Sequence, residues 1–261
     1  MLHRPARAPA TLQSFVLHRY DWSESSLILD LFTREQGRLA VAAKGAKRPH
    51  SQLRAVLLPF QRLQVTLARS RALADDPAPP EVQTLRAAEW SGGAAMLTGA
   101  ALFAGFHCNE LLMKLLARHD PHPQLFDAYA QTLPLLADRD DARVQAALRA
   151  FELVLLREVG VLPDLCFVTQ TQQVVGERDR MALLPELGVI AAPAGEAGLP
   201  GSVLIGLQAA LDHGSVAALR QACAVALPEL KAALRTLLHY HLGTPAMRTR
   251  QVMIELQTLN P

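Results

Sequence analysis

The residues of this chain with the clearest chemical potential are the cations of its first 71 positions. This segment contains twelve lysines and arginines and only four carboxylates, which gives it a net charge of +8. Because the whole chain carries +2, the remaining 190 residues carry −6. Such concentrated positive charge is typical of a surface that binds a phosphate backbone, and the alternative is a solvated basic face without a partner. The cations are Arg4, Arg7, Arg19, Arg34, Arg38, Lys44, Lys47, Arg48, Arg54, Arg62, Arg69 and Arg71.

No arrangement of side chains in the sequence predicts catalysis. The sequence contains no phosphate-binding glycine loop, nucleophile elbow or metalloprotease helix motif. His239 and His241 are two positions apart, so on a helix they do not face each other as a metal pair would. Asp138, Asp140 and Asp141 precede an expected helix, where they suit capping. We therefore expect a protein that is not an enzyme and has no cofactor, bound metal or small-molecule substrate.

Composition favours a globular protein of the cytoplasm. Half of the residues are apolar and 19% are charged, and the three cysteines form no CxxC pair, as suits a reducing compartment. The N-terminal arginines are not followed by the apolar stretch of a signal peptide. No run reaches the ~18 apolar residues of a membrane span. We expect a cytoplasmic protein, associated with the nucleoid if it binds DNA, and no membrane partner.

The first third of the chain alternates apolar and polar residues, as half-buried antiparallel strands do. Leu27, Leu29 and Leu31 share one face and Asp30 lies on the other. Glu35-Gln36-Gly37 supplies a tight hairpin turn. Five short strands are the number expected of an OB-type barrel. They are expected at residues 11–20, 25–33, 38–44, 60–68 and 82–88.

A change of character after Gly92-Gly93 divides the chain into two domains. Residues 1–80 are expected to form the barrel, with a final strand or linker to about 92, and proline marks 75–80 as a loop. Residues 93–261 are expected to form a mainly α-helical domain whose segment 160–200 is an irregular insert with a short hairpin. The expected fold class is thus α+β with two domains. The expected helices are 94–118, 123–136, 142–159, 202–211, 216–227, 230–241 and 245–259.

A barrel with outward cations suits single-stranded nucleic acid, because the charges follow the backbone while aromatic side chains stack on bases. The glycine-containing loop from Lys44 to His50 is expected to be mobile and to bring three cations onto phosphates. Trp22, in a polar turn, is expected to be exposed, whereas Phe32 and Phe60 suit the barrel core or rim. The residues predicted to contact DNA are Arg19, Arg34, Arg38, Lys44, Lys47, Arg48, Arg54, Arg62 and Trp22.

A series of short motifs runs along most of the chain: Phe15-Val16-Leu17-His18-Arg19, Trp22-Ser23-Glu24-Ser25-Ser26-Leu27, Phe32-Thr33 with Gly37-Arg38, Ala43-Lys44-Gly45-Ala46, Leu58-Pro59-Phe60, Leu85-Arg86-Ala87-Ala88-Glu89, Asn109-Glu110-Leu111-Leu112 and Ala147-Leu148-Arg149-Ala150-Phe151-Glu152-Leu153. In this order the motifs resemble the RecO family of bacterial recombination mediators, most weakly at 169–200. The resemblance implies an N-terminal OB fold, a helical C-terminal domain, binding of single- and double-stranded DNA and annealing of complementary strands. It also implies action with RecR to displace SSB so that RecA can load.

The sequence departs from the family at the insert, where many members carry a four-cysteine zinc module. Cys166 matches the first ligand, but Thr169 stands where the second cysteine would be, and no cysteine or histidine follows before Gly198. A structural zinc site needs four ligands, so we expect no zinc. The insert is instead expected to be held by packing of Leu165, Phe167, Val174 and Val175.

The resemblance also implies that the helical domain binds the acidic, apolar C-terminal tail of SSB. Such a tail needs an apolar groove with a cation at its rim for the terminal carboxylate. Arg149, beside Phe151, is the leading predicted cation, and Arg157 lies two turns further along the same helix face. The alternative is that both are ordinary solvated helix arginines.

The leading hypothesis is therefore a DNA-binding and strand-annealing recombination mediator. Its contacts should run through phosphate and tolerate any sequence. A protein-protein adaptor, using the barrel and a helical groove without strong DNA affinity, is the alternative from another class. An RNA-binding OB module is a third reading, since composition does not distinguish the two nucleic acids.

Overall fold

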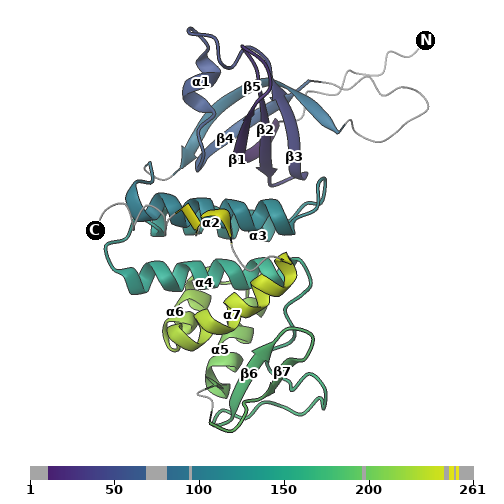
Figure 1. Ribbon diagram of the computed structural model, residues 1–261, viewed down its shortest axis with the longest axis vertical. Coiled ribbons are helices and arrows are strands. Elements are labelled where there is room, and N and C mark those ends of the chain that lie inside the picture. The colour runs from purple at the N-terminus through teal and green to yellow at the C-terminus, as the bar shows by residue number, and fades with distance from the viewer. Residues whose placement is uncertain are drawn as a thin grey trace, which may run out of the picture. The chain divides into compact units, whose positions relative to one another are not determined.

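The alternating pattern of the first third becomes a closed five-stranded barrel in the computed structural model, which describes residues 11–68, 81–93, 96–195, 198–243, 247–249 and 251–252. The chain divides into two units, drawn in Figure 1. The first unit comprises residues up to Met96 together with Leu116–Phe126, and the second comprises Leu97–Leu115 and the residues from Asp127 onward. The loop expected at 75–80 and most of the helix expected at 245–259 lie outside the described residues.

The barrel has the strand order β1-β2-β3-β5-β4 and closes by pairing of β1 with β4. The pairing of β3 with β5 is parallel and the other pairings are antiparallel. This confirms the five-stranded OB-type expectation. A short helix, α1, precedes β4. The sequence did not predict it, because five residues are too few to show a helical period. The elements are β1 (Thr11–Asp21), β2 (Leu27–Thr33), β3 (Gly37–Ala43), α1 (Gln52–Val56), β4 (Gln61–Leu67) and β5 (Val82–Gly93).

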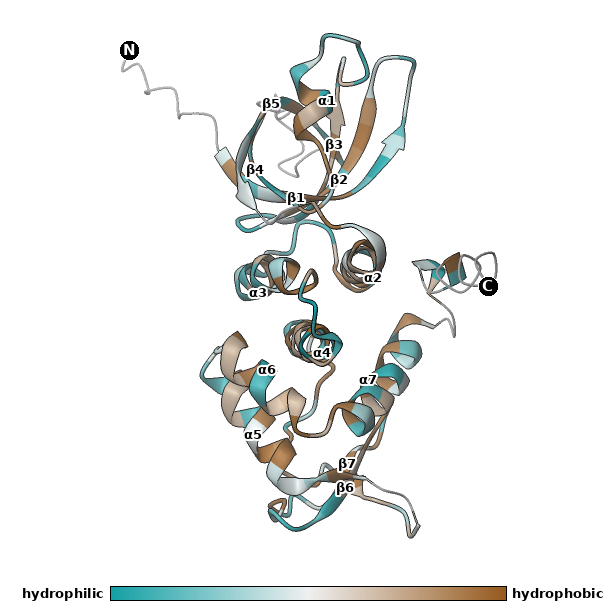
Figure 2. Ribbon diagram, turned by 90° about the vertical axis from the view of Figure 1, so that its left-hand side faces the viewer, coloured by the Kyte–Doolittle hydropathy of each residue, from teal (hydrophilic) through white to brown (hydrophobic). Residues whose placement is uncertain are grey.

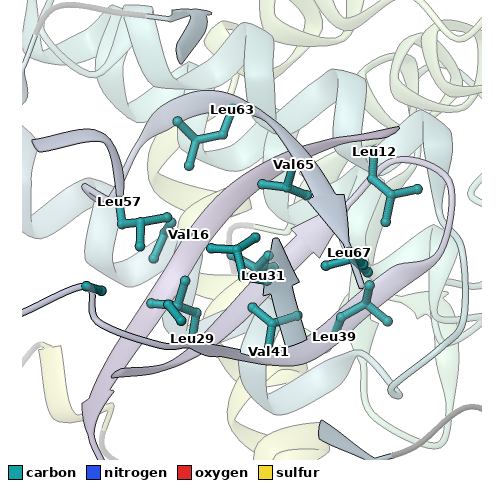
Figure 3. Close-up of a cluster of buried hydrophobic side chains, with 13 residues drawn as sticks. Leu12, Val16, Leu29, Leu31, Leu39, Val41, Leu57, Leu63, Val65 and Leu67 are labelled. Carbon is teal, nitrogen blue, oxygen red and sulfur yellow. The ribbon is translucent and has the colours of Figure 1, made fainter. Parts of the chain in front are cut away.

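Leucine and valine side chains from every strand fill the barrel (Figure 3). Leu29, Leu31, Leu39 and Val41 are completely buried, as the period-two pattern of β2 and β3 predicted. Burying one such side chain contributes about 1.5–3 kcal/mol. The β1–β2 register shifts between Val16 and His18, so that an extra residue is accommodated at Leu17, and four consecutive β1 residues, from Ser14 to Leu17, are buried.

The outer face of β2 and β3 is not solvated, although the sequence placed polar residues there. Asp30 is only 2% exposed and accepts two hydrogen bonds from Arg38, at 2.9 Å (Nε to Oδ1) and 3.1 Å (Nη2 to Oδ2). Arg118 reaches the same carboxylate at 3.4 Å, and Arg38 also donates to the Leu116 carbonyl at 3.0 Å. Residues 116–126 therefore cover this face, and Arg38 does not point into solvent as predicted.

The rest of this covering segment packs closely on the barrel. The Phe126 ring lies 5.1 Å from the Phe15 ring and 5.4 Å from the Phe32 ring, between centroids. Gly37 has φ +68°, and a Cβ there would lie 1.9 Å from the Asp120 carbonyl oxygen. Only glycine fits this position, because any other residue would be strained and would collide with backbone.

The second unit is mainly helical, with α4 at its centre. Figure 2 shows α4 end-on with α6 and α7 on either side, and both pack against it. Asp140 caps α4 by accepting a hydrogen bond from the Ala142 N–H at 2.9 Å, as the acidic cluster predicted. The helices are α2 (Gly99–Leu115), α3 (Pro123–Leu135), α4 (Asp141–Glu158), α5 (Gly201–Asp212), α6 (Val216–Ala224) and α7 (Leu227–Leu242), with the first residues of α3 counted in the first unit.

The insert contains the expected hairpin, formed by β6 (Arg180–Leu184) and β7 (Gly188–Ala191), with a third short strand, β8 (Leu199–Pro200). Leu165 and Val175 are buried, as expected, but Phe167 is 36% and Val174 72% exposed. The expectation that all four pack inside was therefore wrong for the second pair. These two residues pair with each other as an isolated bridge on the surface.

Glu110 on α2 binds the described part of the C-terminal segment. Its carboxylate accepts hydrogen bonds from the backbone N–H groups of Arg248 (2.9 Å) and Thr249 (3.0 Å) and from the Thr249 hydroxyl (2.6 Å). Partial burial alone would raise the pKa of Glu110. The hydrogen bonds from Thr249, Arg248 and Lys114 outweigh burial and lower this pKa from 4.5 to about 2.

We expect Asp30→Asn to lower the free energy of unfolding by about 3–5 kcal/mol, because it leaves the guanidinium of Arg38 buried without its counter-charge. Urea unfolding followed by tryptophan emission measures this, since Trp22 and Trp90 both lie in the first unit. Asp21→Asn is the matched control: its side chain is 79% exposed, so a change within about 0.5 kcal/mol is expected. Parental stability in Asp30→Asn would contradict this role of the ion pair.

The stability that Glu110 contributes should depend on pH. Because the folded-state pKa is depressed, the contribution is fully present above the ordinary pKa of 4.5 and is lost as pH falls toward about 2. Glu110→Gln should therefore be less stable than the parent at pH 7, and this difference should shrink at pH 3.5. Urea unfolding followed by far-UV circular dichroism provides the comparison, with exposed Glu177→Gln as control. A difference that does not change with pH would argue against the interaction.

Candidate nucleic-acid interface

The barrel has two ends, and the predicted DNA-contacting residues divide between them. Leu27 pairs with Ala43 at one end, and Thr33 pairs with Gly37 at the other. We call the first the loop end, since the β1–β2 loop and the β3–α1 loop leave the barrel there. The loop end carries six predicted residues: Arg19, Trp22, Lys44, Lys47, Arg48 and Arg54, the last on α1.

The two loops of the loop end are hydrogen-bonded to each other. The Lys47 N–H donates to the Ser25 carbonyl at 3.0 Å, and the Gly45 N–H donates to the Ser26 hydroxyl at 3.4 Å. The Arg48 N–H donates to the Gly45 carbonyl at 3.1 Å, so residues 44–50 form successive hydrogen-bonded turns. These backbone hydrogen bonds set the position of the cations that the loop carries.

The cations of the loop end differ in how they are engaged. Lys47 is ion-paired with Asp21 at 3.1 Å and donates to the Ser23 carbonyl at 3.0 Å. Within the described part of the chain, the exposed side chains of Lys44, Arg48 and Arg54 make no hydrogen bond or ion pair. Arg19 donates to the Leu57 carbonyl at 3.2 Å and leaves its other donors available. The ammonium and guanidinium groups can therefore donate hydrogen bonds to anionic oxygen atoms of a ligand.

Exposed aromatic side chains accompany these cations. Trp22 is 57% exposed, as predicted, and Tyr20 is 44% exposed with its ring 4.4 Å from the ring of His18. The buried positions of Phe32 and Phe60 also agree with prediction. Sequence reasoning missed Trp90, which is 64% exposed, because it ended the last strand at residue 88 whereas β5 continues to Gly93.

Three other predicted contacts lie away from the loop end. Arg34 belongs to the β2–β3 turn at the opposite end of the barrel. Arg38 is 13% exposed and bound to Asp30. Arg62 donates to Gln13 and lies over the Phe126 ring, with 6.0 Å between Cζ and the centroid. The expectation that the cations point outward is therefore wrong for Arg38 and Arg62, which hold the covering segment.

Arg149 and Phe151 do not form the rim of a groove. Phe151 is completely buried, and Arg149 is 6% exposed with its guanidinium 2.6 Å from the carboxylate of Glu152. The pKa of Glu152 would be raised by burial but is lowered overall, first by the charge of Arg149 and then by His107, 3.1 Å away. Arg157 is 40% exposed and lies 3.5 Å from Asp212. Of this set, only Arg157 is placed as a surface cation.

The insert does not fit a four-ligand metal site. The Thr169 hydroxyl accepts a hydrogen bond from the Val189 N–H at 2.9 Å, so this side chain joins its turn to β7. Among the residues that the structure describes, no group of three His, Cys, Asp or Glu side chains could hold a metal ion. Hydrogen bonds and the buried Leu165 and Val175 thus hold the insert together.

The buried thiols are not suited to nucleophilic chemistry. Burial raises the pKa of Cys108 far above its ordinary value and that of Cys223 to about 12. Both thiols therefore stay protonated at neutral pH, whereas the thiolate is the reactive form.

In the described ranges no helix is long and apolar enough to cross a membrane.

Comparison with protein families gives two matches along the chain. Residues 9–75 match Recombination protein O N terminal, and residues 96–251 match Recombination protein O C terminal. The chain belongs to the RecO family. The DNA repair protein RecO of Verminephrobacter eiseniae is 51% identical over 256 residues, covering 97% of this chain and 99% of that protein. The RecO proteins of a Polaromonas species and of Variovorax paradoxus are each 48% identical, covering 94% and 98% of this chain and 96% and 98% of theirs.

Membership of the RecO family confirms the resemblance found in the sequence motifs. It supports a role in recombinational DNA repair, and the relatives are named as repair proteins rather than enzymes. The RecO N-terminal match covers β1 to β4 and the whole loop end, including the six predicted residues there. The surface described above is therefore part of a RecO domain.

Replacement of Arg149 distinguishes a core residue from a partner-binding residue. We expect Arg149→Ala to lower the free energy of unfolding by about 3–5 kcal/mol, because Glu152 would then lack its main buried counter-charge. Arg157→Ala, on the exposed part of the same helix, should stay within about 0.5 kcal/mol. Urea unfolding followed by circular dichroism compares the two, and equal stabilities would be inconsistent with a structural role for Arg149.

Proposed function

We propose that this protein binds DNA at the loop end of its barrel and anneals complementary single strands during recombinational repair. Membership of a DNA repair family and the exposed cations Lys44, Arg48 and Arg54 support the proposal. The observation that carries it is their combination with exposed Trp22 on one ordered surface, because backbone charges and stacking aromatics are the two components of sequence-tolerant strand binding.

The proposal extends to the partners of the pathway. The protein would act with RecR on single-stranded DNA coated by SSB, so that RecA can load, and would also bind double-stranded DNA. For the acidic tail of SSB, Arg157 is the cation of the predicted set whose exposure suits a terminal carboxylate. The adaptor alternative would keep these protein contacts but show little DNA affinity at physiological salt.

The test is fluorescence anisotropy of a labelled single strand of about 30 nucleotides at several salt concentrations. Contact with several phosphates gives a steep negative slope of log affinity against log salt, of about 0.7 per neutralised phosphate on a single strand. Lys44→Ala with Arg48→Ala should weaken binding equally for different sequences and reduce this slope by about 1.4. The unfolding free energy should not change, since both side chains are exposed.

Arg178→Ala with Arg180→Ala is the matched control, because it removes the same charge from exposed positions of the insert. Its affinity and salt slope should equal those of the parent. Equal losses in the two double variants would show that net charge, rather than the loop end, determines binding. No binding by the parent even at low salt would favour the adaptor alternative.

A further inference from the structure

The loop end contains a pocket of about 410 Å³ that combines apolar and cationic walls. This volume lies within the range of about 300–1,000 Å³ typical of small-molecule sites. Its apolar wall comes from the β2 start, the β3–α1 loop and the end of α1, and its charged wall from β1, the same loop and α1. The lining residues are Arg19, Asp21, Leu27, Ala46, Lys47, Arg54 and Leu57.

The apolar wall of the pocket rests on the barrel core. Leu57 is completely buried and Ala46 is 1% exposed, and both belong to the barrel core, against which Leu27 packs. Both side chains support Leu27 from below, and Leu27 is the partly exposed apolar side chain of the pocket. A flat base or a deoxyribose gains by covering the exposed part of Leu27.

The charged wall can bind one phosphate group. Arg54 is exposed and makes no hydrogen bond or ion pair within the described residues, and the ammonium of Lys47 is placed by Asp21 and Ser23. Arg19 stands beside them, held by the Leu57 carbonyl. A guanidinium offers a fixed fork of donors that matches phosphate oxygens, and a neighbouring ammonium adds a point charge.

From this arrangement we infer that the pocket takes one nucleotide of the bound strand, with its phosphate on Arg54 and Lys47 and its base and sugar against Leu27, which the buried Ala46 and Leu57 support. The inference rests on the proposed DNA binding and adds a defined subsite to it. Trp22 follows Asp21 directly in the chain and is exposed, so it is placed to stack on an adjoining base. A nucleotide suits this pocket better than an acidic peptide of Asp and Leu, which has no flat ring that could stack on Trp22.

Asp21 gives the subsite a second property. In the free protein its carboxylate Oδ1 is ion-paired with the Lys47 ammonium at 3.1 Å. A phosphate oxygen that binds Lys47 would take the same position. An incoming phosphate must therefore compete with Asp21 and is repelled by it. Removing the charge with Asp21→Asn should strengthen nucleotide binding, whereas removing the cation with Arg54→Ala should weaken it. A purely structural role of these exposed residues would not produce opposite changes.

Thymidine monophosphate is the probe, and Trp22 is the reporter. The sequence has two tryptophans, so Trp90→Phe leaves Trp22 as the single emitter. In that background the titration of Trp22 emission should saturate with thymidine monophosphate, and thymidine, which lacks the phosphate, should bind about tenfold more weakly. Arg54→Ala should lower the affinity for thymidine monophosphate by about tenfold, and Asp21→Asn should raise this affinity severalfold.

Two further variants separate the pocket from general electrostatics. Leu27→Phe keeps every cation but fills the apolar wall, so it should abolish saturable nucleotide binding and keep the salt slope of the 30-nucleotide strand. Arg48→Ala removes an exposed cation that does not line the pocket, so it should keep nucleotide binding. Circular dichroism establishes that each variant is folded, and Leu27→Ala replaces Leu27→Phe if the larger side chain prevents folding, with weaker nucleotide binding expected.

The outcomes distinguish this inference from the function on which it depends. Strand binding with a steep salt slope, but without saturable binding of thymidine monophosphate, would overturn the subsite and leave the proposed function intact. Failure to bind strand and nucleotide alike would remove both. Saturable binding of acetyl-Asp-Asp-Leu in place of the nucleotide would also overturn the subsite and assign the pocket to a peptide. Loss of nucleotide binding in Arg54→Ala and Leu27→Phe, with retention in Arg48→Ala, is the result expected.

Discussion

The bidentate ion pair between Asp30 and Arg38 determines which part of the barrel stays open to ligands. A carboxylate that is 2% exposed is unfavourable unless its charge is matched, and Arg38 and Arg118 supply that match. Arg38 also holds the Leu116 carbonyl, so one guanidinium joins β3 to residues 116–126. The outer face of β2 and β3 thereby becomes an interior, and the exposed cations Lys44, Arg48 and Arg54 lie where the two loops leave the barrel.

This division explains why basic residues of one domain have different tasks. Arg38 and Arg62 serve the covering segment, the first through an ion pair and the second through contact with Phe126. Lys44, Arg48 and Arg54 retain their donors, and backbone hydrogen bonds between the loops hold their positions. Net charge alone does not separate the two groups, because the distinction arises from segments far apart in the chain.

Much of the fold was predictable from the sequence, because short-range periodicity reports burial directly. The alternation of Leu27, Leu29 and Leu31 located β2, and the apolar helical pattern located α2 and α4. The strand alternation wrongly placed Asp30 in solvent, since it does not show that a segment almost ninety positions later covers the outer face of β2. The helical pattern failed for Arg149 because α4 is buried on several sides, so a charged residue could be taken for the solvent face. The pocket was not predictable either, since its walls come from four separate stretches of chain.

Gly37 and Asp120 have a consequence for synthesis on the ribosome. The hairpin that contains Gly37 uses local contacts and can form within about 1–10 μs once its residues have emerged. The backbone of Asp120, which fills the space beside that glycine, is made about eighty residues later. At roughly 5–20 residues per second, this is a delay on the order of 4–16 s. Until Phe126 has been made, Phe15 and Phe32 lack this neighbour, so the growing chain exposes apolar side chains that favour aggregation.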